Sequence, residues 1–387
     1  MNNATVRLWV FFVLILMPAV VEATCVGNVT FSDPTYGATI VRAERPEGHE
    51  HNIYYTRRAW NADATRLVGV RSDVNQQNWV VVLYDGAGCY LRDLFSVDEY
   101  DWRLAWDRLD PDVLYTWKGS SLYRYHVRAG TAKLLKSFAP LWLSPAGPSL
   151  SGDGARILVI TSDGAFRSHR VSDMSEERVF VPVLGCDSDV KAERYIGHGD
   201  LIVTGCTVLG GAAVTRIYRD TGELVREFPR TFGHTDFAAN GQWLWFALGT
   251  SPRDGLPGEP LEIHATDLRS GVDRVIFSAP YTPYLRNLHV ACASLPVRCV
   301  VGFFPYAGLV LESYPPNTPS TYDEIVTLNL EAEPVTVTYL ARHGSSASTF
   351  WAQPLASPSA DGGKLSFNSD AAGTIDQHVL LVPANRR

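Results

Sequence analysis

The sequence predicts an all-β protein made of repeated units of short strands. A tight Asp-Gly turn precedes a short apolar run in "PSLSGDGARILVITSDG" (148–164) and again in "SADGGKLSFNSD" (359–370). A second β-prone segment follows each such run. No stretch of the chain has the pattern of a long amphipathic helix. Repeated units that hold several short strands each are typical of a β-propeller, and we expect one with seven blades.

Seven turns of this type can be placed along the chain. Their turn residues, called anchors below, are Asp63, Asp112, Asp153, Asp200, Asn240, Arg298 and Asp361. Successive anchors lie between 40 residues (200 to 240) and 63 residues (298 to 361) apart. The nearly continuous apolar run after an anchor predicts an innermost strand that packs on both faces between neighbouring blades. Two packed sheets with accidental periodicity are the alternative.

The two ends of the chain are expected to close the ring together. The last unit, 353–387, has room for only a few strands, whereas the β-prone segment "GATIVRAE" (37–44) has no unit of its own. We therefore expect 37–44 to join the last blade as an outer strand, which also covers a sheet edge. The Pro- and Gly-rich segments 250–260 and 311–323 predict loops inserted on one face.

The N-terminus has the layout of a secretory signal peptide. Arg7 precedes the apolar stretch 8–21, and a small-x-small cleavage site follows. We expect a signal peptide over 1–23 and a single propeller domain over 24–387 in a secreted or periplasmic protein. An uncleaved membrane anchor and, through Cys25, a lipoprotein are the alternatives.

Composition and charge limit the partners of the protein. The chain of 387 residues is 46% hydrophobic and 11% aromatic, which suffices for a large core, and its formal net charge is −7. An acidic chain lacks the basic face that nucleic acids and anionic membranes require, so neither is expected as a partner. We expect a monomer that does not bind a membrane once the signal peptide has been removed.

The cysteines predict disulfide bonds. All 6 cysteines lie after the predicted signal peptide, and an even number in an exported chain favours disulfides over a metal site. Two local pairs that each flank a turn are expected, Cys186 with Cys206 and Cys292 with Cys299. The remaining pair, Cys25 with Cys89, follows by elimination.

The repeat at 359–370 resembles the repeat of TolB-like propellers. The C-terminal half, roughly 230–387, is similar to the oligogalacturonate-lyase-like group of secreted bacterial propellers. The similar segments are "FGHTDFAANGQ", "LHVACASLPVRCVVG" and "ARHGSSASTFWAQPLASPSADGGKLSFNSD". The resemblance implies the propeller fold and an exported location. Function has to be argued from the site, because propellers host many unrelated functions.

Histidines and arginines recur in the segments that approach the anchored strands. His234 and His289 are the candidate catalytic residues. The candidate ligand-binding residues are Arg57, His198, Arg342, His343, Trp351 and Gln353. Equivalent loops of a closed ring point to the same mouth, so we expect these side chains to converge on one funnel. Imidazoles abstract protons or bind metals, and guanidinium groups neutralise carboxylates. Packing is the alternative role of each residue.

The remaining histidines are not expected to form a site. We expect them at exposed positions or on blade surfaces: His49, His51, His126, His169, His264 and His378.

The resemblance also implies a metal site that this chain does not reproduce. In oligogalacturonate lyases the last approach loop is similar to His-Pro-His-Pro-Ser, and its histidines bind a metal. Here the loop reads Gln353-Pro354-Leu355-Ala356-Ser357, so two ligands are missing. Two histidines rarely suffice for a catalytic metal. We therefore expect no cofactor, with a divalent metal as the alternative.

Two functions are compatible with these observations. The first is an exported propeller that binds a ligand, either a glycan or a protein partner, at its central funnel. The second is a polysaccharide lyase that cleaves uronate-containing glycans by β-elimination, with a histidine as base and an arginine that holds the carboxylate. Binding is favoured because the repeats are clear and the catalytic set is not. Whether the protein is an enzyme stays open.

Overall fold

A computed structural model gives the fold of the chain. The described residues are 29–43, 48–53, 58–97 except 74 and 76, 104–143, 148–181, 191–196, 201–207, 213–228, 234–238, 242–248, 261–279, 287–292, 298–304, 323–383 except 331, 333 and 348, and 386. None of these segments contains a helix long and apolar enough to cross a membrane. The predicted signal peptide, the predicted loop 250–260 and residues 311–322 of the predicted loop 311–323 lie outside the described residues.

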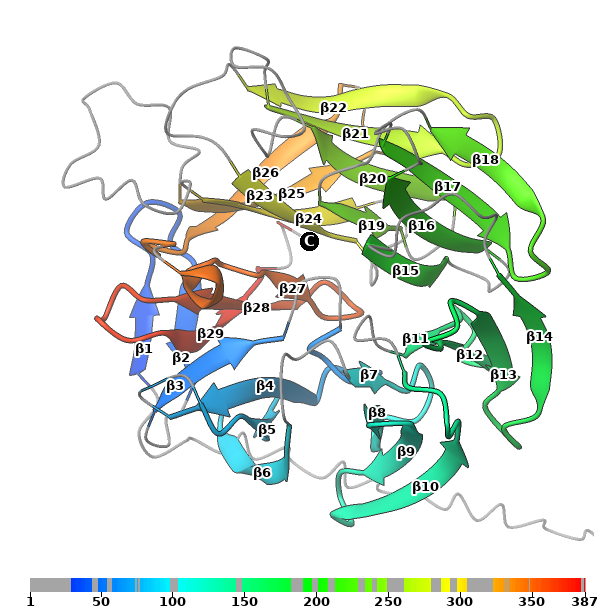
Figure 1. The fold of residues 1–387 in the computed structure, drawn as a ribbon. Helices are drawn as coiled ribbons and strands as arrows, with labels where there is room; N and C mark the ends of the chain where they lie inside the picture. The colour runs from blue at the N-terminus through cyan, green and yellow to red at the C-terminus, as the bar shows by residue number, and fades with distance from the viewer. Residues whose placement is uncertain are drawn as a thin grey trace, which may run out of the picture.

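The described strands form six four-stranded sheets and one five-stranded sheet, arranged in a ring (Figure 1). The first sheet contains β3 (His49–Asn52), β4 (Arg66–Ser72), β5 (Val80–Asp85) and β6 (Tyr90–Ser96). The second sheet contains β7 (Leu104–Trp106), β8 (Val113–Lys118), β9 (Ser121–His126) and β10 (Thr131–Ser137). The third sheet contains β11 (Ser149–Leu150), β12 (Arg156–Ile160), β13 (Phe166–Arg170) and β14 (Glu176–Phe180). The fourth sheet contains β15 (Lys191–Ile196), β16 (Leu201–Thr207), β17 (Ala213–Arg219) and β18 (Leu224–Phe228). The fifth sheet contains β19 (Thr235–Phe237), β20 (Trp243–Leu248), β21 (Leu261–Asp267) and β22 (Asp273–Ala279). The sixth sheet contains β23 (Asn287–Ala291), β24 (Arg298–Phe304), β25 (Glu324–Asn329) and β26 (Thr336–Arg342). Each four-stranded sheet uses four consecutive strands, which is the organisation of a propeller blade, so the all-β propeller prediction is confirmed.

The five-stranded sheet joins the two ends of the chain. It contains β27 (Ser357–Pro358), β28 (Lys364–Ser369) and β29 (Asp376–Leu381), followed outward by β2 (Thr39–Arg42) and β1 (Val29–Ser32). β2 pairs with β29 in antiparallel register. The predicted closure of the last sheet by 37–44 is therefore confirmed. The edge strand β1, which the sequence did not predict, pairs with β2.

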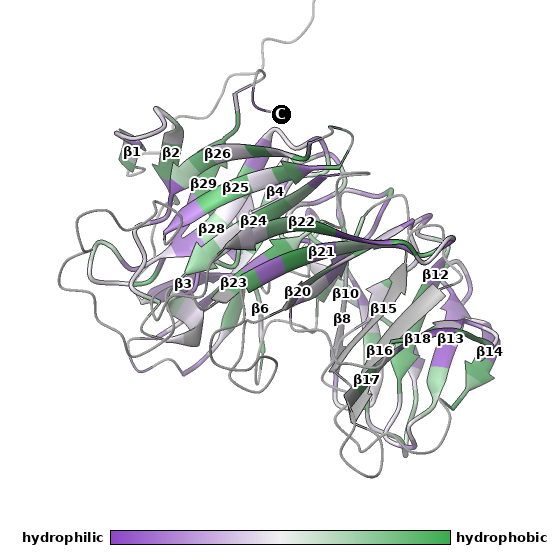
Figure 2. Ribbon diagram, turned by 90° about the horizontal axis from the view of Figure 1, so that it is seen from above, coloured by the Kyte–Doolittle hydropathy of each residue, from purple (hydrophilic) through white to green (hydrophobic). Residues whose placement is uncertain are grey.

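The burial of the strands shows which edge of each sheet faces the ring interior. In β12 four of five residues are buried and in β24 six of seven, whereas β10 and β14 at the opposite edge are largely exposed. Hydrophobic and hydrophilic residues both occur along these strands (Figure 2). A short buried strand such as β19 precedes the apolar run in its sheet. The anchored run is thus the second strand of a sheet, and the expectation that it is the innermost strand is wrong.

The recurring Asp-Gly turns share one hydrogen-bond pattern. Ser151 Oγ donates to Asp153 Oδ1 (2.5 Å) and accepts from the backbone N–H of Arg156 (2.9 Å). Ser359 Oγ does the same with Asp361 Oδ1 (2.6 Å) and a backbone N–H five residues on (3.0 Å). The serine thereby satisfies the backbone at the start of the second strand, and the aspartate closes the turn. This chemistry explains why the Ser-x-Asp-Gly pattern repeats.

A cation at one position of this turn motif connects neighbouring sheets. Arg66 forms an ion pair with Asp112 of the second sheet, and Arg156 forms one with the buried Asp220 of the fourth sheet. Lys364 donates to a backbone carbonyl of the first sheet (3.1 Å). Each of these side chains starts the second strand of its own sheet, so the repeated turn also ties one sheet to the next.

The outermost strands pack on glycines of the following sheet. The residues and the glycines that lie under them are Arg92 with Gly130, Phe180 with Gly222, and Arg226 with Gly271. The three glycines precede the fourth strand of their sheets and have positive φ angles of 67°, 87° and 78°. A Cβ on Gly222 would lie 2.8 Å from the Cβ of Phe180, closer than carbon atoms approach in folded proteins.

The substitution Gly222→Ala should lower the free energy of unfolding by about 2–3 kcal/mol, because it adds a steric clash to the strain of a positive φ. Gly164→Ala is the matched control, since Gly164 has a φ of 77° and nothing within 4 Å of the added Cβ. Gly164→Ala should lower the free energy of unfolding by only about 1 kcal/mol. Urea denaturation of both variants measures the difference, and equal losses would show that the contact between sheets contributes nothing.

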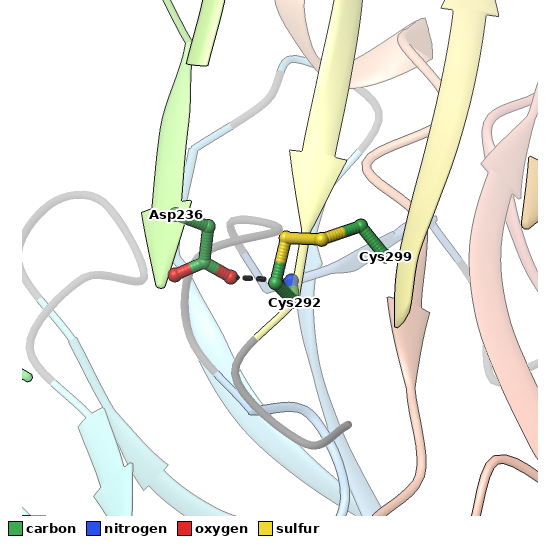
Figure 3. The surroundings of a disulfide bond; sticks show 3 residues. All are labelled: Asp236, Cys292 and Cys299. Carbon is green, nitrogen blue, oxygen red and sulfur yellow. Dashed lines mark hydrogen bonds between the residues drawn. A yellow bond between two sulfur atoms is a disulfide. The ribbon is translucent and has the colours of Figure 1, made fainter. Parts of the chain in front are cut away.

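One predicted disulfide is present. Cys292, directly after β23, and Cys299 in β24 are bonded with a Cα–Cα distance of 4.3 Å. The backbone N–H of Cys292 donates to Asp236 Oδ2 of the preceding sheet (2.6 Å, Figure 3). Cys89 is also disulfide-bonded. Its predicted partner Cys25 lies outside the described residues, as does Cys186, so the pairings Cys25–Cys89 and Cys186–Cys206 stay predictions.

Candidate functional site

Three of the predicted site residues meet at the start of three consecutive sheets. His234 immediately precedes β19, and His289 is the middle residue of β23. Gln353 follows the short 3₁₀ helix η3 (Phe350–Ala352) and precedes β27. First strands in neighbouring blades lie side by side, and the segments that lead into them end on the same face of the ring.

The two imidazole rings and the amide are in direct contact. The ring centroids of His234 and His289 lie 4.4 Å apart. The Nε2 atom of His289 lies 2.7 Å from Gln353 Oε1. On its other side, the ring of His289 stacks on Phe304 with a centroid distance of 4.8 Å. The side chains therefore form one cluster, called the His234 cluster below (His234, His289 and Gln353).

The hydrogen bonds assign the protons of the two rings. His234 Nδ1 donates to the backbone carbonyl of Leu288, so its Nε2 is the acceptor nitrogen of the neutral ring. The amide oxygen of Gln353 can only accept, so His289 carries its proton on Nε2. The strand β23 therefore orients His234 through the backbone carbonyl of Leu288, and it carries His289 itself.

Burial keeps both imidazoles neutral. It lowers the pKa of His234 to about 4, although the hydrogen bond to Leu288 acts in the opposite direction. Burial also holds the pKa of His289 well below its ordinary value, and the neighbouring His234 lowers it further. At neutral pH the His234 cluster carries no net charge, and its groups act as neutral hydrogen-bond donors and acceptors.

The His234 cluster is accessible from one side. His234 and Gln353 are partly exposed, whereas His289 lies beneath them with 1% of its surface exposed. A ligand at this face would meet the imidazole of His234 and the amide of Gln353 first. His289 would act on such a ligand through its contacts with these two residues.

Two other predicted residues, Arg342 and His343, do not join the cluster. Arg342 is exposed, and its guanidinium lies 3.7 Å from the carboxylate of Asp323. His343 is buried, and both ring nitrogens bond to backbone groups, to the carbonyl of Phe303 (2.6 Å) and the N–H of Ser345 (2.9 Å). These partners give His343 a structural role. Arg57 and His198 lie outside the described residues.

Trp351 packs inside the molecule. Only 5% of its surface is exposed, and its ring lies 5.0 Å from His51 and 5.2 Å from Trp79, centroid to centroid. A ring in this position has no face on which a sugar could stack. Trp351 instead connects the segment before β27 with the first sheet, where it supports the loop that carries Gln353.

Most of the histidines expected at the surface are buried. His51 and His169 have no exposed surface, and His264 and His378 have 6% each. The surface location predicted for these four residues is wrong. Neighbouring sheets cover the strands that carry them, and the sequence does not show which face of a strand a neighbouring sheet will cover.

The His234 cluster does not fit a divalent metal. The part of the chain that the structure describes contains no group of three or more His, Cys, Asp or Glu side chains that could hold one. In the last approach loop, the positions where the related loop has histidines hold Gln353 and the buried Leu355. Two imidazoles and one amide are fewer strong donors than a catalytic metal requires.

Phe304 and the carbonyl of Leu288 are parts of the site that the sequence did not indicate. In the antiparallel register of β23 and β24, Asn287 lies opposite Phe304 and Leu288 opposite Phe303. This register brings Phe304 onto His289. The pattern of the sequence predicts two strands here but not their register, which alone would have revealed the contact.

The fold and this site define a β-propeller with a polar cluster at the first strands of three consecutive sheets. No protein-family model matches the chain, and no curated protein sequence matches it. Among solved structures, an oligogalacturonate lyase in complex with manganese matches with a TM-score of 0.67 and 15% identity, covering 92% of this chain and 96% of that one. The oligogalacturonate lyase of Vibrio parahaemolyticus matches with a TM-score of 0.68 and 11% identity, covering 93% and 98%. Hydrazine synthase of Kuenenia stuttgartiensis matches with a TM-score of 0.56 and 12% identity, covering 85% and 95%. The chain resembles oligogalacturonate lyases in fold along nearly its whole length.

Proposed function

We propose that this protein is an exported β-propeller that binds a glycan at the mouth of the ring, with the His234 cluster as the center of the site. The observation that carries this proposal is the contact of His234, His289 and Gln353 at one place. These residues are 55 and 64 positions apart along the chain (234 to 289 and 289 to 353) and come from three consecutive sheets.

The chemistry of the cluster suits the hydroxyl groups of a sugar. A neutral imidazole accepts a hydrogen bond through one nitrogen, and an amide both donates and accepts. Sugar hydroxyls offer the same combination of donors and acceptors. Within the described residues, Arg342 is engaged with Asp323 and lies outside the cluster. This argues for recognition of hydroxyls rather than of a carboxylate.

The proposal includes seven blades and an exported location. Seven blades result when the five-stranded sheet, closed by β2, counts as a blade like the six four-stranded sheets. The signal peptide predicted over 1–23 and the disulfide between Cys292 and Cys299 support export, because disulfides persist in oxidising compartments. We propose a monomeric domain over 24–387 in the periplasm or outside the cell, with no nucleic-acid or membrane partner.

A lyase is the second candidate function, favoured by the likeness in fold to two oligogalacturonate lyases. In such a reaction a base removes the proton next to a uronate carboxyl group, and the bond to the neighbouring sugar breaks. His234 is the accessible imidazole for this step. A base whose pKa is about 4 is weak at neutral pH, which disfavours this function relative to binding.

A panel of neutral and acidic polysaccharides distinguishes the two functions. Binding is measured by retardation in native gels that contain each polysaccharide. Release of unsaturated uronate products from the same panel is measured by ultraviolet absorbance. Binding without product release supports the proposal, and product release establishes the lyase. A protein that neither binds nor cleaves any member contradicts both.

A further inference from the structure

A cavity between two neighbouring sheets shares no lining residue with the His234 cluster. It has a volume of about 350 Å³ and lies between β18 of one sheet and β20, β21 and β22 of the next. Arg226, Glu227 and Phe228 of β18 line one side, and Phe246 and Asp273 line the other. Cavities of this size hold a small organic molecule.

The acidic residues of this cavity are already paired within the protein. Asp273 accepts a hydrogen bond from Thr266 Oγ1 (2.8 Å) and lies 2.8 Å from Nδ1 of His264, whose Nε2 lies 2.9 Å from Glu262. Glu227 accepts from Arg216 Nε at 2.7 Å. The negative charge of both carboxylates is therefore offset by neighbouring donors, which reduces its effect on a ligand in the cavity.

Arg226 is the cation of the cavity that has no such partner among the described residues. Its guanidinium lies over Gly271, where a Cβ would be 1.6 Å from Nη1. Only a glycine leaves room for the guanidinium at this place. Arg92 lies over Gly130 in the same way but does not line the cavity. The position of Arg226 is thus a property of the fold, and the cavity beside it is particular to this pair of sheets.

Aromatic rings form the apolar part of the cavity. Phe228 is partly exposed at the end of β18. Phe246 is 2% exposed, and its ring stacks on His264 with a centroid distance of 5.0 Å. An apolar surface next to a guanidinium fits a ligand that combines a ring with a negative group, because each part then meets a complementary surface.

We propose that this cavity binds a small carboxylic acid that carries a six-membered ring. The carboxylate pairs with the guanidinium of Arg226, and the ring lies against Phe228. Aromatic acids and uronic acids share this chemistry. The site is independent of the glycan site proposed above, because it uses none of the residues of the His234 cluster.

Ligand-observed NMR with benzoate and with glucuronate tests the proposal on the full chain. Benzyl alcohol and glucose serve as uncharged counterparts. We expect at least one of the two acids to bind, with neither counterpart binding comparably. Arg226→Gln should lower the affinity about tenfold or more, since it removes a charge-assisted interaction. Arg92→Gln is the matched control and should leave the affinity unchanged.

The results distinguish an aromatic acid from a uronic acid as the ligand, and they show whether the proposal holds. Binding of benzoate alone identifies an aromatic acid, and binding of glucuronate alone identifies a uronic acid. Should Arg226→Gln fail to fold, Phe228→Leu removes the aromatic wall and should lower the affinity of whichever acid binds. Binding of neither acid, equal losses in Arg226→Gln and Arg92→Gln, or full affinity in Phe228→Leu would overturn the proposal. Because His234→Ala should leave this binding unchanged, the result does not depend on the glycan site.

Discussion

Lowering the pH from 7 to about 5 is expected to unfold the protein. Burial lowers the pKa of six histidines: His51, His169, His234, His289, His343 and His378. The pKa is about 3 for His51 and about 4 for His169, His234 and His378. Because an unfolded histidine titrates near 6.5, the unfolded chain binds more protons than the folded chain between about pH 6.5 and 4. Stability is therefore present above pH 6.5 and is lost as the pH falls.

The size of this effect is large compared with the stability of a protein. Each histidine with a pKa of about 4 or lower reduces the free energy of unfolding by about 1.4 kcal/mol per pH unit below 6.5, or by about 2 kcal/mol at pH 5. The four histidines with a pKa of about 3 or 4 (His51, His169, His234 and His378) together lose about 8 kcal/mol, which is comparable with the total of about 5–15 kcal/mol that holds a folded protein together. Tryptophan fluorescence and circular dichroism between pH 7 and 4 measure the transition. His378→Gln removes one titrating group and should reduce the pH dependence by about one proton. Cooperative melting that is unchanged down to about pH 4.5 would contradict this prediction.

Replacement of Asn52 by leucine is expected to cost about 3–5 kcal/mol of unfolding free energy, because it leaves several buried polar groups without partners. Asn52 is fully buried in β3. Its Nδ2 donates to the carbonyls of Leu355 (2.7 Å) and Ser366 (3.2 Å). Its Oδ1 accepts from Ser366 Oγ (3.1 Å) and Gln377 Nε2 (3.2 Å). One side chain thus joins the first sheet to the sheet that closes the ring.

Guanidinium denaturation measures this loss. Asn75→Ala is the control, because Asn75 is an exposed turn residue of the same sheet and should cost less than about 0.5 kcal/mol. If Asn52→Leu is as stable as the control, the network around Asn52 does not hold the two ends of the ring together.

The parts of the fold that depend on local chemistry could be predicted from the sequence. Ser151 and Asp153 form a turn because their side chains bond to the backbone within a few residues, so the pattern is visible in the chain itself. The pairing of Cys292 with Cys299 follows from their short separation around a turn. The closing strand could be placed because 37–44 had no unit of its own and the last unit was incomplete.

The parts that depend on neighbouring sheets could not be predicted. β11 and β27 have two residues each, too few to show a periodic pattern. The burial of His169 results from the packing of its strand beneath neighbouring side chains, among them Lys136 and Phe138 of the second sheet. The contact of Gln353 with His289 requires two segments from different sheets to meet. The sequence therefore singled out His234, His289 and Gln353 as candidate residues but did not show that they touch.

The affinity of His234→Ala for the glycan that the wild-type protein binds tests the central claim most directly. The substitution removes the accessible imidazole of the His234 cluster, and His126→Ala, a partly exposed histidine at the end of β9, is the control. We expect His234→Ala to weaken binding by about tenfold or more while its melting temperature at pH 7.5 stays close to that of the control, which should bind normally. A His234→Ala protein that melts early and still binds the glycan with wild-type affinity would show that His234 only packs against His289, and would contradict a binding site at this cluster.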